Sequence, residues 1–227
     1  VILNGIGATL TGGGTVGALL TNGTYTLSGT DLTVGTSTII SSGALTVGAG
    51  RIYTSTSTLT LVGSITGAGT TTIKHSNLST GGTLSSNVSF DASGGAVTAA
   101  ARTYGANVEV INGSGNAVTA GGNATSTSAF MIKAGGSFTA PGATRSLYVG
   151  GDYTNYGTFT HNSGKVFFNG TGGQAISGAT SSSAFNNIDF SGGGAKTFSG
   201  NASTSALTIQ SGSGAVTAPS LRHPATT

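Results

Sequence analysis

Few residues in this chain have side chains that could do chemistry. Cleavage of a glycosidic bond, for example, needs two carboxyl groups roughly 5–10 Å apart. The chain has five acidic residues, which are Asp31, Asp91, Glu109, Asp152 and Asp189. Asp91 and Glu109 lie 18 positions apart and could stack on neighbouring turns of a repeat of that length. We nevertheless expect all five to be solvated surface carboxylates without a catalytic pair.

Metal binding is not favoured either. His75, His161 and His223 are isolated, and no second His or Cys lies at the spacing that a zinc site needs. Calcium-binding β-rolls repeat Gly-Gly-x-Gly-x-Asp, and only Gly150-Gly151-Asp152 is similar to that pattern. We therefore predict neither a zinc nor a calcium site.

The pattern Gly12-x-Gly14-x-x-Gly17 formally matches a dinucleotide-binding fingerprint. That fingerprint requires a helix after the glycines, and no helical pattern follows here. The sequence thus predicts no catalytic, metal-binding or cofactor-binding residue, and it favours a protein that is not an enzyme.

The composition favours a folded, all-β chain with many tight turns. The 227 residues include 41 glycines and 3 prolines, and 6% are charged. Collagen would need glycine at every third position, and disordered chains are usually charged and poor in β-branched residues. Here Val, Ile, Leu, Phe, Tyr and Thr recur at short intervals along the whole chain.

The charges argue against two classes of partner. The net charge of +3 comes from eight basic and five acidic residues that are scattered singly. A surface that binds nucleic acid or a membrane would instead cluster its basic residues. No apolar run reaches the roughly 18 residues of a helical membrane span. Cysteine is absent and the chain begins at Val1. We expect a processed or partial form of an exported protein that binds no nucleic acid.

A short motif, an apolar residue followed by Thr or Ser, recurs in two series along the chain, with steps of 17 to 22 residues within each series. A period near twenty with Gly, Asn and Ser corners is typical of a β-solenoid, whose single turn cannot bury its inward side chains alone. The anchors are Leu10, Leu27, Leu45, Ile65 and Leu84, then Val97, Val118, Phe138, Phe159, Ile176, Phe198 and Val216.

We therefore predict a right-handed parallel β-helix with turns of about 20 residues, continuous over residues 1–227. The step of 13 between Leu84 and Val97 leaves the register uncertain near 85–95. Tandem antiparallel β-sandwiches are the alternative, because residues 123–141 match residues 201–219 at a distance close to the size of a small domain. No Pro/Ser-rich linker separates two halves, which favours the solenoid.

Strand alternation predicts which side chains face the core. In T-Y-T-L-S-G, Tyr25 and Leu27 face inward, and Phe159, Ile176 and Phe198 are expected to form successive levels of one core column. The segment Lys165–Phe168 breaks the alternation, so one of its two phenylalanines is expected at the surface or a corner. Paired glycines, such as 81–82, 135–136 and 150–151, are expected at corners that need positive φ.

One stretch resembles a known group of proteins. Residues 154–178, T-N-Y-G-T-F-T-H-N-S-G-K-V-F-F-N-G-T-G-G-Q-A-I-S-G, followed by F-N-N-I-D-F at 185–190, are similar to repeats of large bacterial exported surface proteins of the hemagglutinin-like and autotransporter-passenger kind. N-G-T-Y-T-L-S-G-T-D-L-T-V-G at 22–35 is similar in style. The resemblance implies a parallel β-helix, an extracellular or cell-surface location and a structural or adhesive role.

The sequence accordingly favours a segment of an exported adhesin, sheath or self-assembling filament. Its expected partners are copies of itself, through solenoid ends or edges, and surface glycans. A carbohydrate-binding or carbohydrate-cleaving β-helix is one alternative. An ice-binding solenoid is another, because Thr-x-Thr occurs at 24–26, 36–38, 54–56, 56–58, 58–60 and 158–160. The ice-binding alternative requires these motifs to occupy the same place in successive turns.

Overall fold

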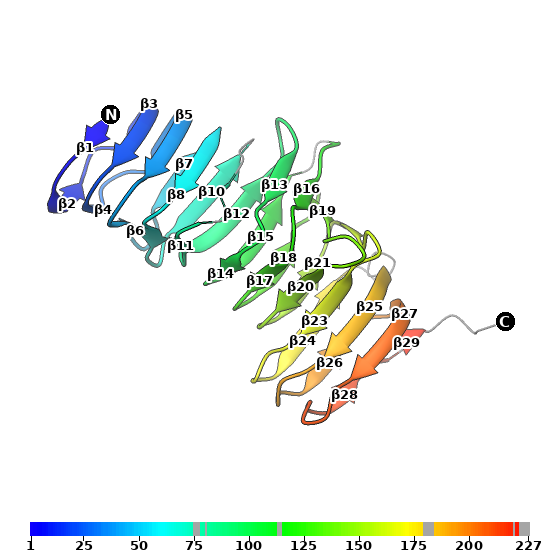
Figure 1. Cartoon of the computed structure of the whole chain (residues 1–227). Coiled ribbons are helices and arrows are strands. Elements are labelled where there is room, and N and C mark those ends of the chain that lie inside the picture. Colours follow the sequence, from blue (N-terminus) through cyan, green and yellow to red (C-terminus); the bar gives the residue numbers. More distant parts are fainter. Residues whose placement is uncertain (75–77, 80, 113–114, 179–183, 220, 223–227) are drawn as a thin grey trace.

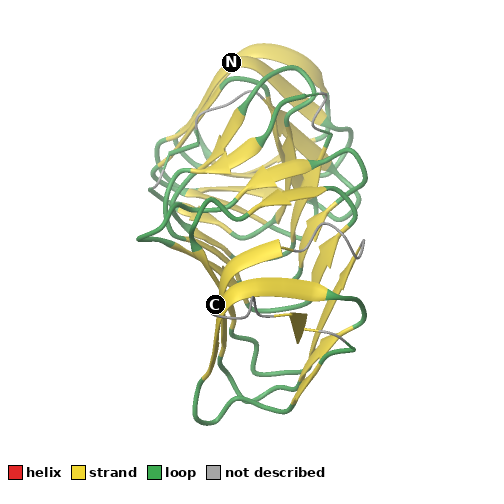
Figure 2. Ribbon diagram, turned by 90° about the vertical axis from the view of Figure 1, so that its right-hand side faces the viewer, coloured by secondary structure: helices red, strands yellow, loops and turns green. Residues whose placement is uncertain are grey.

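The computed structural model describes residues 1–74, 78–79, 81–112, 115–178, 184–219 and 221–222. Its described residues form 29 strands and no helix. The strands succeed one another along a curved rod, with the N-terminus at one end and the C-terminal strands at the other (Figure 1). Seen from the C-terminal side, strands form the sides of the turns and loops form the corners (Figure 2).

The strands belong to three parallel sheets. Sheet A contains β1 (Ile2–Leu3), β3 (Gly14–Thr21), β5 (Leu32–Ile40), β7 (Ile52–Ser55), β10 (Thr70–Lys74), β12 (Asn87–Asp91), β15 (Val108–Ile111), β18 (Phe130–Ile132), β21 (Tyr153–Asn155), β24 (Gln174–Gly178), β26 (Lys196–Phe198) and β28 (Val216–Thr217), with β8 (Thr58–Leu61) paired to β5. Sheet B contains β2 (Ile6–Leu10), β4 (Thr24–Leu27), β6 (Ala44–Val47), β9 (Ser64–Thr66), β11 (Thr83–Leu84), β14 (Thr103–Tyr104), β17 (Ala124–Ser126), β20 (Ser146–Val149), β23 (Lys165–Phe168), β25 (Ala184–Phe190), β27 (Ala202–Ile209) and β29 (Leu221–Arg222). Sheet C contains β13 (Val97–Ala99), β16 (Val118–Ala120), β19 (Ser137–Thr139) and β22 (Thr158–Thr160).

This arrangement confirms the β-solenoid. In the central part each turn contributes one strand to each sheet, as β12, β13 and β14 do. Residues paired in sheet A are about one turn apart, from Thr72 with Ser89 to Thr154 with Ser177. The described strand pairs are parallel, whereas sandwiches are built from antiparallel strands joined by hairpins and Greek-key connections. The alternative of tandem antiparallel sandwiches is therefore wrong.

The register runs without a break through residues 85–95. Strand β12 pairs with β10 on one side and with β15 on the other. The short step in the sequence arises because its two anchors belong to different sheets. Leu84 lies in sheet B and pairs with Tyr104, whereas Val97 begins sheet C and pairs with Val118.

Buried side chains form columns that run along the rod. In sheet C the anchors predicted from the sequence are correct, since Val97, Val118, Phe138 and Phe159 pair in that order. In sheet A the inward column is Leu32, Tyr53, Thr71, Val88, Val108, Phe130, Tyr153, Ile176 and Phe198. Each turn adds one side chain to the column, so burial accumulates with every turn.

One predicted column is partly wrong. Ile176 and Phe198 pair as expected, but Phe159 lies in sheet C and meets sheet A only across the core. Its ring contacts the ring of Tyr153 edge-on, with centroids 6.1 Å apart. The two faces use the same inward residue types, because both line one core.

Lys165–Phe168 keeps the strand alternation, contrary to expectation, but the prediction that one of its phenylalanines lies at the surface is correct. Val166 and Phe168 are buried, and Phe168 packs on Phe190 of the next turn. Phe167 faces outward and stacks on Tyr148 of the preceding turn, with ring centroids 4.7 Å apart and planes 13° apart. An aromatic side chain is thus used here on the outer face, where its partner is another aromatic ring.

Corner glycines serve close approach as well as unusual backbone angles. Gly82 and Gly135 have positive φ, as expected. Gly150 and Gly151 do not, so the expectation of positive φ is wrong for this pair. A Cβ on Gly150 would lie 2.7 Å from the carbonyl oxygen of Thr127 on the preceding turn. Glycine is needed there because neighbouring turns come too close for any side chain.

Candidate functional site

The five carboxylates join neighbouring turns. Four of them form ion pairs with a basic residue one turn away, at N–O distances of 2.6 to 3.7 Å: Asp31 with Arg51, Asp91 with Lys74, Glu109 with Lys133 and Asp189 with Lys165. The fifth, Asp152, accepts a hydrogen bond from the backbone N–H of Ala175 at 2.8 Å. The described acids thus all have structural partners.

Asp91 and Glu109 lie on adjacent turns but do not form a carboxylate pair. Ser89 is the partner of Glu109, whereas Asp91 is paired with Ile111. Burial opposes ionisation of Asp91, but hydrogen bonds from Ser93 and the ammonium of Lys74 outweigh it and lower the pKa of this carboxyl. A general acid for glycoside cleavage requires the opposite, a raised pKa.

The expectation of solvated carboxylates is wrong for two of the acids. Asp91 and Asp189 are buried. Burial without a partner would be costly for an ionised carboxylate, and each has one. Asp189 accepts a hydrogen bond from Gln210 Nε2 at 2.7 Å as well as facing Lys165.

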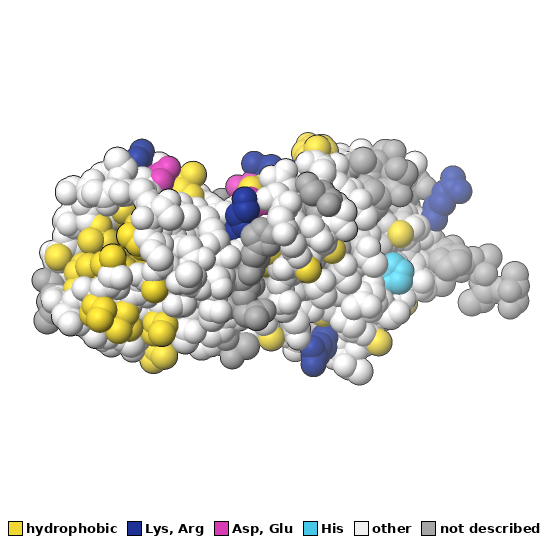
Figure 3. All heavy atoms as spheres, turned by 90° about the horizontal axis from the view of Figure 1, so that it is seen from above, with side chains coloured by type: hydrophobic (Ala, Val, Ile, Leu, Met, Phe, Trp, Pro, Cys, Tyr) yellow, Lys and Arg dark blue, Asp and Glu magenta, His cyan; other side chains and the backbone are white. Residues whose placement is uncertain are grey.

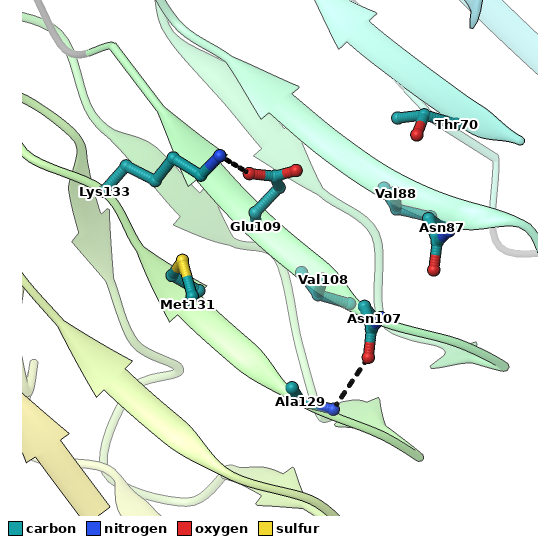
Figure 4. Close-up of a pocket in the computed structure, with 9 residues that line it drawn as sticks. All are labelled: Thr70, Asn87, Val88, Asn107, Val108, Glu109, Ala129, Met131 and Lys133. Atoms are coloured by element: carbon teal, nitrogen blue, oxygen red, sulfur yellow. Dashed lines mark hydrogen bonds and ion pairs between the residues drawn. The ribbon is translucent and has the colours of Figure 1, made fainter. Parts of the chain in front are cut away.

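A groove on the outer face of sheet A is a candidate binding site (Figure 4). It crosses β10, β12, β15 and β18 and has a volume of about 270 Å³. Nine residues line it: Thr70, Asn87, Val88, Asn107, Val108, Glu109, Ala129, Met131 and Lys133. The Glu109–Lys133 ion pair, at 2.6 Å, lies on one side of the groove, and Thr70 and Asn87 lie on the other.

The polar groups of the groove include both donors and acceptors. The Oδ1 atom of Asn107 accepts hydrogen bonds from the N–H of Ala129 and the hydroxyl of Ser128, which leaves its amide N–H groups free to donate. Asn87 donates a hydrogen bond from Nδ2 to the carbonyl oxygen of Ala68. Its Oδ1 is an acceptor for a ligand in the groove. The groove can therefore hold a small polar ligand by hydrogen bonds. Sequence reasoning missed it, because the register brings its residues together from four turns.

The remaining candidates have local structural roles. His161 Nδ1 accepts a hydrogen bond from the N–H of Ser163 and so stabilises a turn. His75 and His223 lie outside the described residues. Within the described residues no three His, Cys, Asp or Glu side chains gather as metal ligands. Gly14 and Gly17 lie in strand β3, so the fingerprint glycines open no helix.

Charged side chains are few and scattered over the surface seen in Figure 3, while apolar side chains gather over the N-terminal turns. Among the exposed apolar side chains of those turns are Ile2, Ile39 and Val62. A membrane-crossing helix is not found in the part of the chain that the structure describes. Comparison with protein-family models, with curated proteins and with solved structures found no match to this chain.

Proposed function

We propose that this chain is a structural β-solenoid segment of an exported surface protein, as in an adhesin, sheath or filament, and that its turns stack end to end on those of another copy. The observation that carries the proposal is a pair of apolar side chains in strand β27 that the rest of the described chain leaves partly exposed. Leu207 and Ile209 pair with Ile188 and Phe190, which are fully buried. Leu207 and Ile209 themselves are 38% and 55% exposed.

These exposed side chains have the chemistry of an interface. Leu207 and Ile209 continue inward columns, so a further turn placed on them would bury apolar surface, at roughly 25 cal/mol for each Å² removed from water. The N–H and C=O groups of the end strand would gain partners in the same step. Another copy offers apolar side chains at its N-terminal end, where Leu3, Leu10 and Val16 are partly buried against the core.

The use of charge supports a mechanical role. Ion pairs connect adjacent turns, as that between Lys74 and Asp91 does. An exported location is supported by the absence of cysteine, the small number of charges and the resemblance of residues 154–178 to exported surface repeats.

Sedimentation and electron microscopy of the chain test the stacking. We expect concentration-dependent, end-to-end particles that the double change Leu207→Lys and Ile209→Lys abolishes. The matched control is Ile39→Lys, which changes an apolar side chain of 40% exposure on the side of the rod. A chain that stays monomeric at every concentration contradicts the proposal, as does equal disruption by the control. Protease treatment of intact source cells tests the location, since a surface protein is degraded.

A second function, binding of a neutral saccharide, is favoured by one observation, the mixed donors and acceptors of the sheet A groove. Sugar hydroxyls both donate and accept hydrogen bonds, as Asn107 and Glu109 would require. A glycan array should show binding that Asn107→Ala and Glu109→Gln remove. Thr154→Ala, on the same face but outside the groove, should leave it unchanged. An array without binding rejects this function.

A further inference from the structure

The outer face of sheet B carries a two-column array of small side chains. One column consists of Thr9, Thr26, Thr46 and Thr66 on four successive strands. The other consists of Ala44, Ser64 and Thr83, preceded by Thr24 and continued by Thr103 and Thr125. These residues alternate with buried ones such as Tyr25, Leu45 and Ile65, so they face outward.

The correct register makes this array more regular than the sequence indicates. Leu27 and Leu45 are anchors of the sequence repeat, but Leu45 pairs with Tyr25. In register, the successive strands read T-Y-T at 24–26, A-L-T at 44–46, S-I-T at 64–66 and T-L-S at 83–85. The two outward positions are therefore Thr, Ser or Ala in every one of these turns.

The array has a fixed geometry. Neighbouring strands hold equivalent side chains roughly 4.8 Å apart, and alternate residues of one strand are about 6.6 Å apart. The hydroxyls of Thr46 and Thr66 lie 3.3 Å from each other, within hydrogen-bond distance, so these two side chains lie next to each other on the outer face. Threonine has a strongly restricted χ1 angle in a strand. The strands thus hold these hydroxyl- and methyl-bearing residues at regularly spaced backbone positions.

The absence of charge distinguishes this face from the outer face of sheet A. Strands β2, β4, β6, β9, β11, β14 and β17 contain no charged residue. The outer face of sheet A, by contrast, carries Lys74, Asp91 and Glu109. A charged group orients water around itself, whereas hydroxyls can join a hydrogen-bonded water layer as donors and acceptors.

We propose that the outer face of sheet B, over β4, β6, β9, β11 and β14, holds an ordered layer of water and through it binds the surface of ice. The regular spacing suits a ligand that is itself a lattice, and the hydroxyl groups can join an ordered water layer as donors and acceptors. No aromatic side chain faces outward on these strands, the first in sheet B being Tyr148 beyond them. This activity does not depend on end-to-end stacking.

The experiment measures inhibition of ice recrystallisation and the gap between melting and freezing points. The test variant is Thr46→Tyr with Thr66→Tyr, which adds bulk to the centre of the array. The matched control is Thr119→Tyr with Thr139→Tyr, because these residues are paired outward threonines of sheet C. We expect the unmodified chain and the control to be active and the test variant to lose activity.

A second variant distinguishes loss of ice binding from loss of the fold. Thr46→Val with Thr66→Val keeps the shape and the strand propensity but removes both hydroxyls, and it should also lose activity while its thermal melt stays cooperative. An unmodified chain without ice activity overturns the proposal, and so does equal loss in the sheet C control. Binding to insoluble cellulose or chitin without any effect on ice assigns the face to a polysaccharide and overturns it as well.

Discussion

Gln174 and Lys196 lie side by side in the interior, paired on β24 and β26, with 2% and 0% exposure. The ammonium of Lys196 donates to the carbonyl oxygens of Gly170 at 2.9 Å and Gly194 at 2.7 Å. Gln174 Oε1 accepts from the N–H of Gly170 at 2.7 Å. Burial lowers the pKa of Lys196. Backbone carbonyls of a glycine-rich corner are the hydrogen-bond acceptors that hold this cation inside the rod.

Replacing Lys196 should be far more costly than replacing a surface lysine. Lys196→Ala leaves a cavity and two carbonyls without donors, and we expect a loss of about 2–4 kcal/mol. Lys196→Met, which fills the cavity, should lose less. Lys133→Ala, whose side chain is 50% exposed, should cost at most about 1 kcal/mol. Urea denaturation measures all three. Equal midpoints for Lys196→Ala and Lys133→Ala would show that the buried ammonium contributes nothing.

Removal of one buried hydroxyl should stabilise the chain. The hydroxyl of Tyr153 is buried without a hydrogen-bond partner among the described residues, and such a group costs about 1–3 kcal/mol. Tyr153→Phe should therefore raise the melting temperature. Tyr104→Phe is the matched control, because its hydroxyl donates to the carbonyl of Ala100 at 3.0 Å. That change should cost about 1 kcal/mol. If thermal melts show both variants shifted the same way, the hydroxyl environments are not the cause.

The fold could be predicted because its determinants are local and repeated. Each turn needs only alternating apolar residues and corners that a short residue can fill, and the anchors of sheet C, from Val97 to Phe159, pair as the period indicates. The assignment of anchors to faces could not be predicted. The segments V-T-A in sheet C and A-I-S in sheet A look alike, because all faces line the same core. Only the strand pairing shows that Phe159 belongs to sheet C and Ile176 to sheet A.

The candidate sites were less predictable. The groove beside Glu109 depends on which outward residues of four turns lie next to one another, and a shift of one residue would remove it. The buried position of Lys196 contradicts the general tendency of lysine to stay in water. The ion pairs are weakly indicated in the sequence, because opposite charges recur about one turn apart. Lys74 and Asp91 are one example, and Glu109 and Lys133 are another.

Alkaline pH should unfold the chain. Burial raises the pKa of Tyr53, Tyr104 and Tyr153 well above the ordinary value of 10.0. Above that value the unfolded chain loses these protons while the folded chain keeps them, so stability falls as pH rises. Lys196 acts in the opposite direction, because its lowered pKa makes stability rise with pH up to its ordinary value of 10.5. We expect the loss of stability from the three tyrosines to exceed the gain from the one lysine, so that the chain becomes less stable as the pH rises above 10.0.

Tyrosinate absorbance and circular dichroism, followed together during an alkaline titration, check this prediction. The three buried tyrosines should ionise only as the strand signal is lost. Complete ionisation of all six tyrosines near their ordinary pKa, with the strand signal unchanged, would contradict it.

Contact between turns should make some glycines irreplaceable and others not. A Cβ on Gly164 would lie 2.0 Å from the carbonyl oxygen of Pro141 on the preceding turn, whereas a Cβ on Gly173 would meet nothing within 4 Å. Gly164→Ala must push two turns apart, and we expect a loss of about 1–3 kcal/mol. Gly173→Ala should change stability by less than about 0.5 kcal/mol. Thermal melts of the two variants measure the difference, and equal melting temperatures would mean that neighbouring turns are not in contact at Gly164.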